Sequence, residues 1–149
     1  MARVLLDKSV AGEAWFKKAV TELSTCSNVK FLYSDDEKYR GEVLSSEFLA
    51  RFLKLMKDKG KREDTDPTEC RRIIDRLEAT TQFKNEQACD DPHLFAIVYQ
   101  KPDPFVFTSD KRLLDCRRCM TTVLDQRYRN FSTIQSEENY RANSGRIRA

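Results

Sequence analysis

Apolar positions along the chain form short runs of strand type that alternate with longer stretches of helical spacing. Four runs predict strands, at Arg3 to Leu6, Val29 to Tyr33, Phe105 to Thr108 and Phe131 to Gln135. Strands that alternate with helices indicate a parallel sheet covered on both faces, because parallel neighbours need a crossover that a helix usually provides. We therefore expect an α/β fold, a three-layer α/β/α sandwich whose central, mainly parallel sheet has four to five strands.

Between these strands, apolar residues at spacings of three and four predict helices. The longest of them begins after Tyr33 and extends to Met56 without a break. The charged stretch from Lys57 to Asp66 is expected to be a loop. Further helices are expected over Val10 to Leu23, Asp66 to about Phe83, Asp91 to Val98 and from Asp110 onward.

The length of 149 residues, with 40% hydrophobic residues, suits one domain with one core. We assign that domain to residues 1–135 and expect residues 136–149 to form a flexible, basic C-terminal tail. The formal net charge of +3 comes from the end of the chain, because the segment from Arg127 to Ala149 has five arginines and two glutamates. A basic tail beside an acidic site would suit a polyanionic substrate.

No apolar stretch approaches the roughly 18 residues that a membrane span needs, and the Met-Ala-Arg start leads directly into the first strand. We expect a cytoplasmic protein without a membrane partner. Glycine occurs only at positions 12, 41, 60 and 145, which excludes the glycine-rich phosphate loops of P-loop and dinucleotide-binding domains.

The five cysteines lack the even, dense spacing of a secreted disulfide framework, so we expect reduced thiols. Cys116 and Cys119 form a Cys-x-x-Cys pair, but no second pair follows and His93 is the only histidine. A four-ligand zinc site therefore lacks partners.

Three aspartates fall at or beside the predicted carboxyl edge of the sheet, where open parallel sheets bind their ligands. Asp7 ends the first strand, Asp110 follows the strand that begins at Phe105, and Asp91 opens the helix that leads into that strand. Clustered carboxylates favour Mg²⁺ or Mn²⁺, which prefer oxygen ligands. Helix capping is a second interpretation for Asp91 and Asp110, because aspartate is also preferred at helix starts.

Residues 90–97, Asp-Asp-Pro-His-Leu-Phe-Ala-Ile, and 105–114, Phe-Val-Phe-Thr-Ser-Asp-Lys-Arg-Leu-Leu, resemble the second half of a PIN domain. In that family an acid opens a helix, and the next strand ends in Thr-Ser/Gly-Asp-Lys-x-Leu-Leu. Val4 to Ser9 is similar to the family's first strand with its Asp-x-Ser, and Phe131 to Tyr140 resembles its closing strand. The resemblance implies a PIN-like fold and a metal-dependent ribonuclease, either the toxin of a toxin-antitoxin pair or an RNA-processing enzyme.

Matching positions imply that Asp7, Asp91 and Asp110 are catalytic acids that bind Mg²⁺ or Mn²⁺. The family's further acid is a glutamate early in the helix after the second strand, and Glu42 is favoured over Glu37 for that role.

Four other polar residues near these acids have two interpretations each. Ser9 and Ser109 are candidates for contact with metal-bound water or phosphate, or for helix caps. Asp90 and Asp115 are candidates for outer partners of the acids, or for surface positions.

The activity expected from the resemblance is hydrolysis of RNA phosphodiester bonds by an endoribonuclease. The expected partners are an RNA substrate, an antitoxin protein if the chain is a toxin, and a second copy in a homodimer. A catalytically inactive PIN-like module that binds RNA or a protein partner is the alternative.

Overall fold

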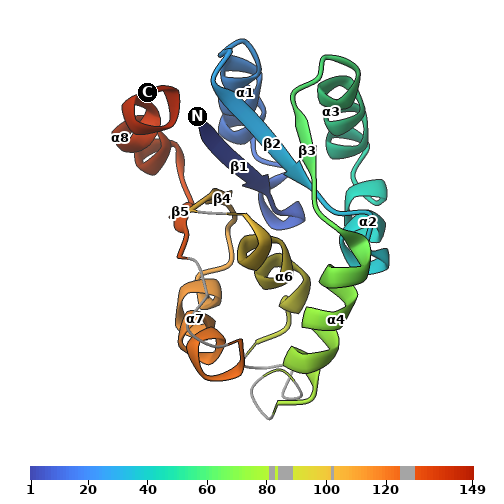
Figure 1. The fold of residues 1–149 in the computed structure, drawn as a ribbon. Coiled ribbons are helices and arrows are strands. Elements are labelled where there is room, and N and C mark those ends of the chain that lie inside the picture. The colour runs from blue at the N-terminus through green and yellow to red at the C-terminus, as the bar shows by residue number, and fades with distance from the viewer. Residues whose placement is uncertain (81–82, 84–88, 102, 125–129) are drawn as a thin grey trace.

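The computed structural model describes residues 1–80, 83, 89–101, 103–124 and 130–149, with the main chain alone for 118–123. Figure 1 shows its helices and strands, coloured from the N-terminus to the C-terminus. They are β1 (Ala2–Leu6), the short 3-10 helix η1 (Lys8–Val10), α1 (Ala14–Ser24), β2 (Val29–Tyr33), α2 (Glu37–Leu44), α3 (Glu47–Asp58), β3 (Arg62–Asp64), α4 (Pro67–Glu78), α6 (Pro92–Gln100), β4 (Phe105–Phe107), α7 (Arg112–Val123), β5 (Ser132–Ile134) and α8 (Glu137–Arg148).

The five strands form one sheet in the order β3-β2-β1-β4-β5, and every neighbouring pair is parallel. Helices cover both faces, with α4 and α6 in front of the sheet and α1 and α3 behind it in Figure 1. The expected three-layer α/β/α sandwich is therefore confirmed, with all described strands parallel.

The core lies between the central strands and the helices on each face. Val4, Leu5 and Leu6 of β1 are all fully buried, as expected for a parallel strand covered on both sides. On one face the ring of Phe107 in β4 packs against Phe16 of α1, with ring centroids 6.0 Å apart. This packing holds the carboxyl end of β4, which lies beside the carboxyl end of β1 in the sheet, and the candidate site is built from these two strand ends.

The single long helix expected up to Met56 is two helices. Ser45 ends α2, and the Ser46 hydroxyl accepts a hydrogen bond of 3.3 Å from the Leu49 amide to cap α3. The expectation was wrong because apolar residues continue at helical spacing across the break, so the pattern alone did not show it. The helix expected to reach about Phe83 ends at Glu78.

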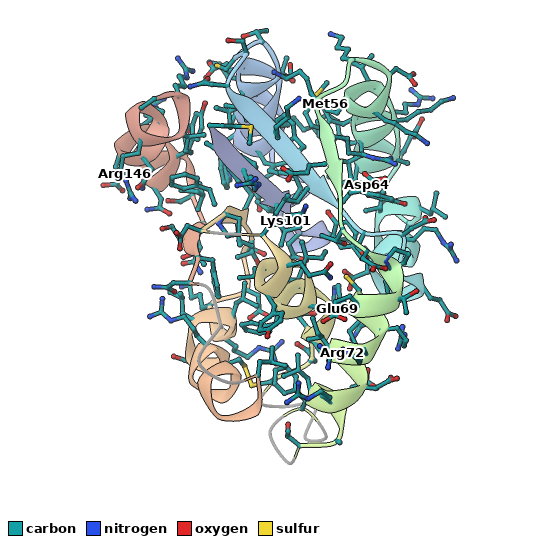
Figure 2. The ribbon with its side chains drawn as sticks, in the orientation of Figure 1. Met56, Asp64, Glu69, Arg72, Lys101 and Arg146 are labelled. Atoms are coloured by element: carbon teal, nitrogen blue, oxygen red, sulfur yellow. A yellow bond between two sulfur atoms is a disulfide. The ribbon has the colours of Figure 1, made fainter. Side chains whose placement is uncertain are left out.

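The charged stretch expected to be a loop contains the edge strand β3. The strand has no apolar residue, and it is held by main-chain bonds such as that from the Phe31 amide to the Lys61 carbonyl, at 2.9 Å. Glu63 accepts from Arg3 at 2.9 Å and pairs with Lys101 at 3.2 Å, the latter labelled in Figure 2. Charged residues suit an edge strand because they oppose pairing with another chain.

The flexible tail expected at residues 136–149 is instead helix α8. The Ser136 hydroxyl caps it by accepting from the Asn139 amide at 3.1 Å, and Tyr140 and Ile147, seven residues apart, bury one face. Only two apolar residues anchor the helix, which is why the polar composition suggested a flexible segment.

The basic residues at the end of α8 lie at the amino edge of the sheet, opposite the aspartates. The guanidinium of Arg146, labelled in Figure 2, lies 5.4 Å from the ring centroid of Phe105, the first residue of β4. The Arg148 carbonyl accepts from Asn28, just before β2. These two arginines therefore do not adjoin the acids, and the interpretation of a basic tail beside an acidic site is wrong for them; Arg127 and Arg129 are outside the described residues.

Docking of α8 predicts that Tyr140→Phe destabilises the protein. The Tyr140 hydroxyl donates to Glu22 at 3.1 Å and accepts from Arg148 at 3.4 Å, and the change removes both bonds while keeping the ring. We expect the free energy of unfolding to fall by about 0.5–1.5 kcal/mol. Urea unfolding measures it, and an unchanged midpoint would show that α8 is not held by these contacts.

The expectation that all the cysteines are reduced thiols is wrong for two of them. Cys89 and Cys116 form a disulfide, while Cys26 and Cys70 are free. The sequence did not suggest this pair, because 27 residues separate the two cysteines and only the fold brings them together. The side chain of Cys119 is outside the described residues.

Within the described part of the chain, no helix has the length and apolar character required to cross a membrane.

Candidate metal centre

Asp7 and Asp110 come together because β1 and β4 are parallel neighbours. Leu6 stands beside Phe107 in the sheet, and the Asp7 amide donates to the Phe107 carbonyl at 2.9 Å. Asp110 follows three residues after Phe107, and Asp91 precedes α6, the helix that leads into β4. All three aspartates thus reach the same edge of the sheet.

The Asp7 side chain is 4% exposed and is held by two hydroxyl groups. Ser9 and Thr108 both donate to its Oδ2 atom, at 2.5 Å and 2.7 Å. Burial raises the pKa of Asp7 above its ordinary value, although these hydrogen bonds act in the opposite direction. The fold therefore fixes the direction of this carboxylate and makes its negative charge costly.

The serines join the segment after β1 to the segment after β4. The Ser9 hydroxyl accepts from the Ser109 amide at 3.0 Å, and the Ser109 hydroxyl donates to the Ser9 carbonyl at 3.1 Å. Thr108 also accepts from the Asp110 amide, at 3.0 Å. Ser9 and Ser109 thus cross-link the two strand ends, a role that neither sequence interpretation included.

Asp91 occupies the N-cap position of α6, but its side chain makes no capping hydrogen bond. The N-cap residue Asp66 of α4, by contrast, accepts from the Thr68 amide at 2.9 Å. Capping therefore does not explain Asp91.

The surroundings of Asp91 oppose its ionisation. Burial, followed by the negative charges of Asp7, Asp90 and Glu42 and a proton shared with Asp110, raises its pKa to about 8. Without a cation, this carboxyl group holds its proton at neutral pH.

Asp110 does cap a helix, and it also faces Asp91. Its Oδ1 atom accepts from the Arg112 amide at 2.9 Å and from the Arg112 guanidinium at 3.2 Å. Burial raises the pKa of Asp110, but the Arg112 contacts outweigh it and the pKa is lowered. Arg112 also pairs with Asp90 at 3.2 Å, so its charge neutralises part of the cluster.

Among the residues that the structure describes, two overlapping groups of side chains could hold a metal ion, and Asp91 belongs to both. One is Asp90, Asp91 and Asp110, and the other is Glu42, Asp91 and His93, with the ligand atoms of each group within 4.8 Å of one another. Asp7 belongs to neither group, yet among the neighbouring charges its charge has the largest effect in raising the pKa of Asp91.

Two other candidate acids, Glu37 and Asp115, fall outside both groups. Glu37 is exposed beside the cleft that Glu42 also lines, so Glu42 is the glutamate of α2 that the fold brings to Asp91. Asp115 is exposed on α7, as its surface interpretation expected. Asp90 is a partner of the cluster.

His93 is the site residue that the sequence analysis missed as a functional candidate. It is 1% exposed, and its Nε2 atom lies 2.7 Å from Oε2 of Glu42. Burial raises the pKa of Glu42, but the hydrogen bond and charge of His93 and the charges of Lys38 and Lys8 outweigh it and lower the pKa. The sequence feature that could have indicated this role is the lone histidine, two residues after Asp91, at the start of a mostly apolar helix.

Clefts on either side of Glu42 reach this group from the solvent. One of about 540 Å³ is lined by Glu42, Asp90 and Asp91, and one of about 480 Å³ is lined by Glu42, Lys8 and Arg71; Lys38 lines both. The carboxylate oxygens of these groups, with a charge excess that keeps a proton on Asp91, fit a divalent cation.

Comparison of the chain with models of protein families, with curated proteins and with solved structures gives no match in any of the three.

Proposed function

We propose that this chain is a Mg²⁺- or Mn²⁺-dependent endoribonuclease that hydrolyses RNA phosphodiester bonds. The observation that carries the proposal is the crowding of Asp91 by Asp7, Asp90, Asp110 and Glu42, with no capping role for its side chain. Such a cluster is unfavourable until a cation binds. Perturbed carboxylates in a cleft are candidates for a functional site.

The donor atoms favour a hard cation. Carboxylate oxygens from Asp90, Asp91, Asp110 and Glu42 are the ligands that Mg²⁺ and Mn²⁺ prefer. When bound, such an ion activates water and stabilises the negative charge that develops on a phosphate under attack.

The neighbouring residues orient the acids and attract a polyanion. Ser9 and Thr108 fix the Asp7 carboxylate, and Arg112 holds Asp110. Lys8 and Lys38 line the clefts beside Glu42 and provide positive charge near a negative centre. Positive charge beside the acids in the same clefts suits a nucleic-acid substrate with its phosphate backbone.

The choice of RNA, and the expectations of a cytoplasmic toxin with an antitoxin partner or a second copy of the chain, come from the resemblance of residues 90–97 and 105–114 to PIN domains. We include the RNA substrate, the toxin role and these partners in the proposal on the basis of that resemblance.

The test is incubation of the purified protein with end-labelled single-stranded RNA, an RNA hairpin and single-stranded DNA of the same sequence. We expect cleavage of RNA with Mg²⁺ or Mn²⁺ and none with EDTA. Cleavage that persists in EDTA would contradict the metal mechanism. RNA binding without cleavage in either metal would favour the inactive module instead.

A further inference from the structure

The buried contact between His93 and Glu42 joins two helices at the candidate centre. His93 lies in the first turn of α6 and Glu42 in α2, 51 residues apart in the chain. The His93 ring is 1% exposed, whereas the Glu42 side chain keeps 28% of its surface exposed. The buried histidine is thus the anchored partner, and the glutamate reaches from it toward the cleft.

The hydrogen-bond pattern assigns the proton of the imidazole. Nδ1 of His93 is buried and has no hydrogen-bond partner among the described residues, while Nε2 lies 2.7 Å from Glu42. A carboxylate only accepts, so Nε2 must carry the proton that is donated. Because that proton occupies the position at Nε2 where a metal would bind, His93 in this arrangement does not offer Nε2 to a metal.

His93 is held in place by packing. Its ring centroid lies 6.3 Å from that of Tyr39 in α2, and Tyr39 in turn donates to the Leu6 carbonyl at 2.9 Å, one residue before Asp7. Both aromatic side chains are buried. The Glu42 carboxylate is therefore tied to the same framework that holds Asp7 and Asp91.

A free glutamate side chain loses rotamer freedom when it binds an ion, and this loss is a cost in conformational entropy. A donor that already fixes the carboxylate removes part of this cost, and hydrogen-bond partners of metal ligands act in this way in other proteins. We propose that His93 is a positioning residue that orients Glu42 for the cation without ligating the cation itself. This inference rests on the metal-binding part of the proposed function and does not depend on RNA cleavage.

The test is Mn²⁺ affinity measured by EPR titration for the wild type and two variants. In His93→Gln the amide nitrogen takes the place of Nε2, whereas in the matched control His93→Asn it takes the place of Nδ1 and falls short of Glu42. We expect His93→Gln to stay within about threefold of the wild type and His93→Asn to weaken Mn²⁺ binding by about 10–100-fold. Melting temperatures in EDTA identify any variant that does not fold.

Pulsed EPR of Mn²⁺ bound to the wild type tests the same idea without a substitution. We expect no ¹⁴N coupling from a directly bound imidazole, because His93 does not ligate the cation in this proposal. His93 is the only histidine, so any such coupling would come from it. Such a coupling would overturn the positioning role, as would equal losses in the two folded variants or a wild type that binds no Mn²⁺. Wild-type Mn²⁺ binding that depends on the donor at position 93, without RNA cleavage, would support this inference and contradict the ribonuclease.

Discussion

Asp91→Asn is expected to reduce metal-dependent RNA cleavage by more than about 100-fold while the protein stays folded. Loss of an outer partner of a metal ligand commonly costs about 10–100-fold, and Asp91 is shared by both candidate ligand groups, so its loss should cost more. The substitution keeps the shape of the side chain and removes only its charge. Initial cleavage rates at saturating Mg²⁺, with circular dichroism for the fold, measure the effect.

The matched control is Asp115→Asn, an equal change of charge on the exposed surface of α7. Its rate should stay within about twofold of the wild type, because exposed substitutions away from the site have small effects. Equal losses in the two variants would show that net charge and not the Asp91 position matters. A fully active Asp91→Asn protein would remove the basis of the proposed function.

The parts of the fold that follow from the sequence are those with continuous apolar runs. The strand predicted at Val29 to Tyr33 has those bounds in the structure, because nearly every residue in it is buried. Strand β3 was missed since Arg-Glu-Asp carries no apolar signal and pairs only through its main chain. Helix α8 was missed because it has few apolar residues. Its Ser136 cap and its acidic first turn at Glu137 and Glu138 are nevertheless helix-start features present in the sequence.

The site was predictable to the extent that it depends on strand ends. Asp7 and Asp110 follow β1 and β4, so the general rule for parallel sheets places them at one edge. The capping alternative for Asp91 could be decided only by the direction of its side chain. The choice of Glu42 over Glu37 and the role of His93 depend on how α2 packs against α6, and no local pattern encodes that packing.

Without metal, the stability of the protein is expected to fall as the pH rises from about 4 to about 8. The pKa of Asp91 is about 8 in the folded protein and 3.8 in the absence of perturbation, so between these values the folded state retains a proton that the unfolded state has lost. Each pH unit then lowers the free energy of unfolding by at most about 1.4 kcal/mol. The real slope is smaller because Asp91 keeps partial contact with solvent.

A divalent cation should reverse this loss, because it replaces the proton as the source of positive charge. We expect Mg²⁺ to raise the melting temperature more at pH 8 than at pH 6, where it must first displace the proton on Asp91. The pKa of Asp7 is also raised, so Asp7 changes stability in the same direction. Glu42 and Asp110 have lowered pKa values and stay ionised between pH 6 and pH 8.

The Asp91→Asn variant isolates the contribution of this one group, since every other titrating residue is present in both proteins. In EDTA it should melt at a higher temperature than the wild type at pH 8 and show a shallower pH dependence between pH 6 and pH 8. If Asp91 were only a helix cap, its replacement would instead lower stability by about 1 kcal/mol at both pH values. Differential scanning calorimetry at pH 6 and pH 8 separates the two cases by the sign of the change, and only an increase is consistent with a carboxylate that needs a cation.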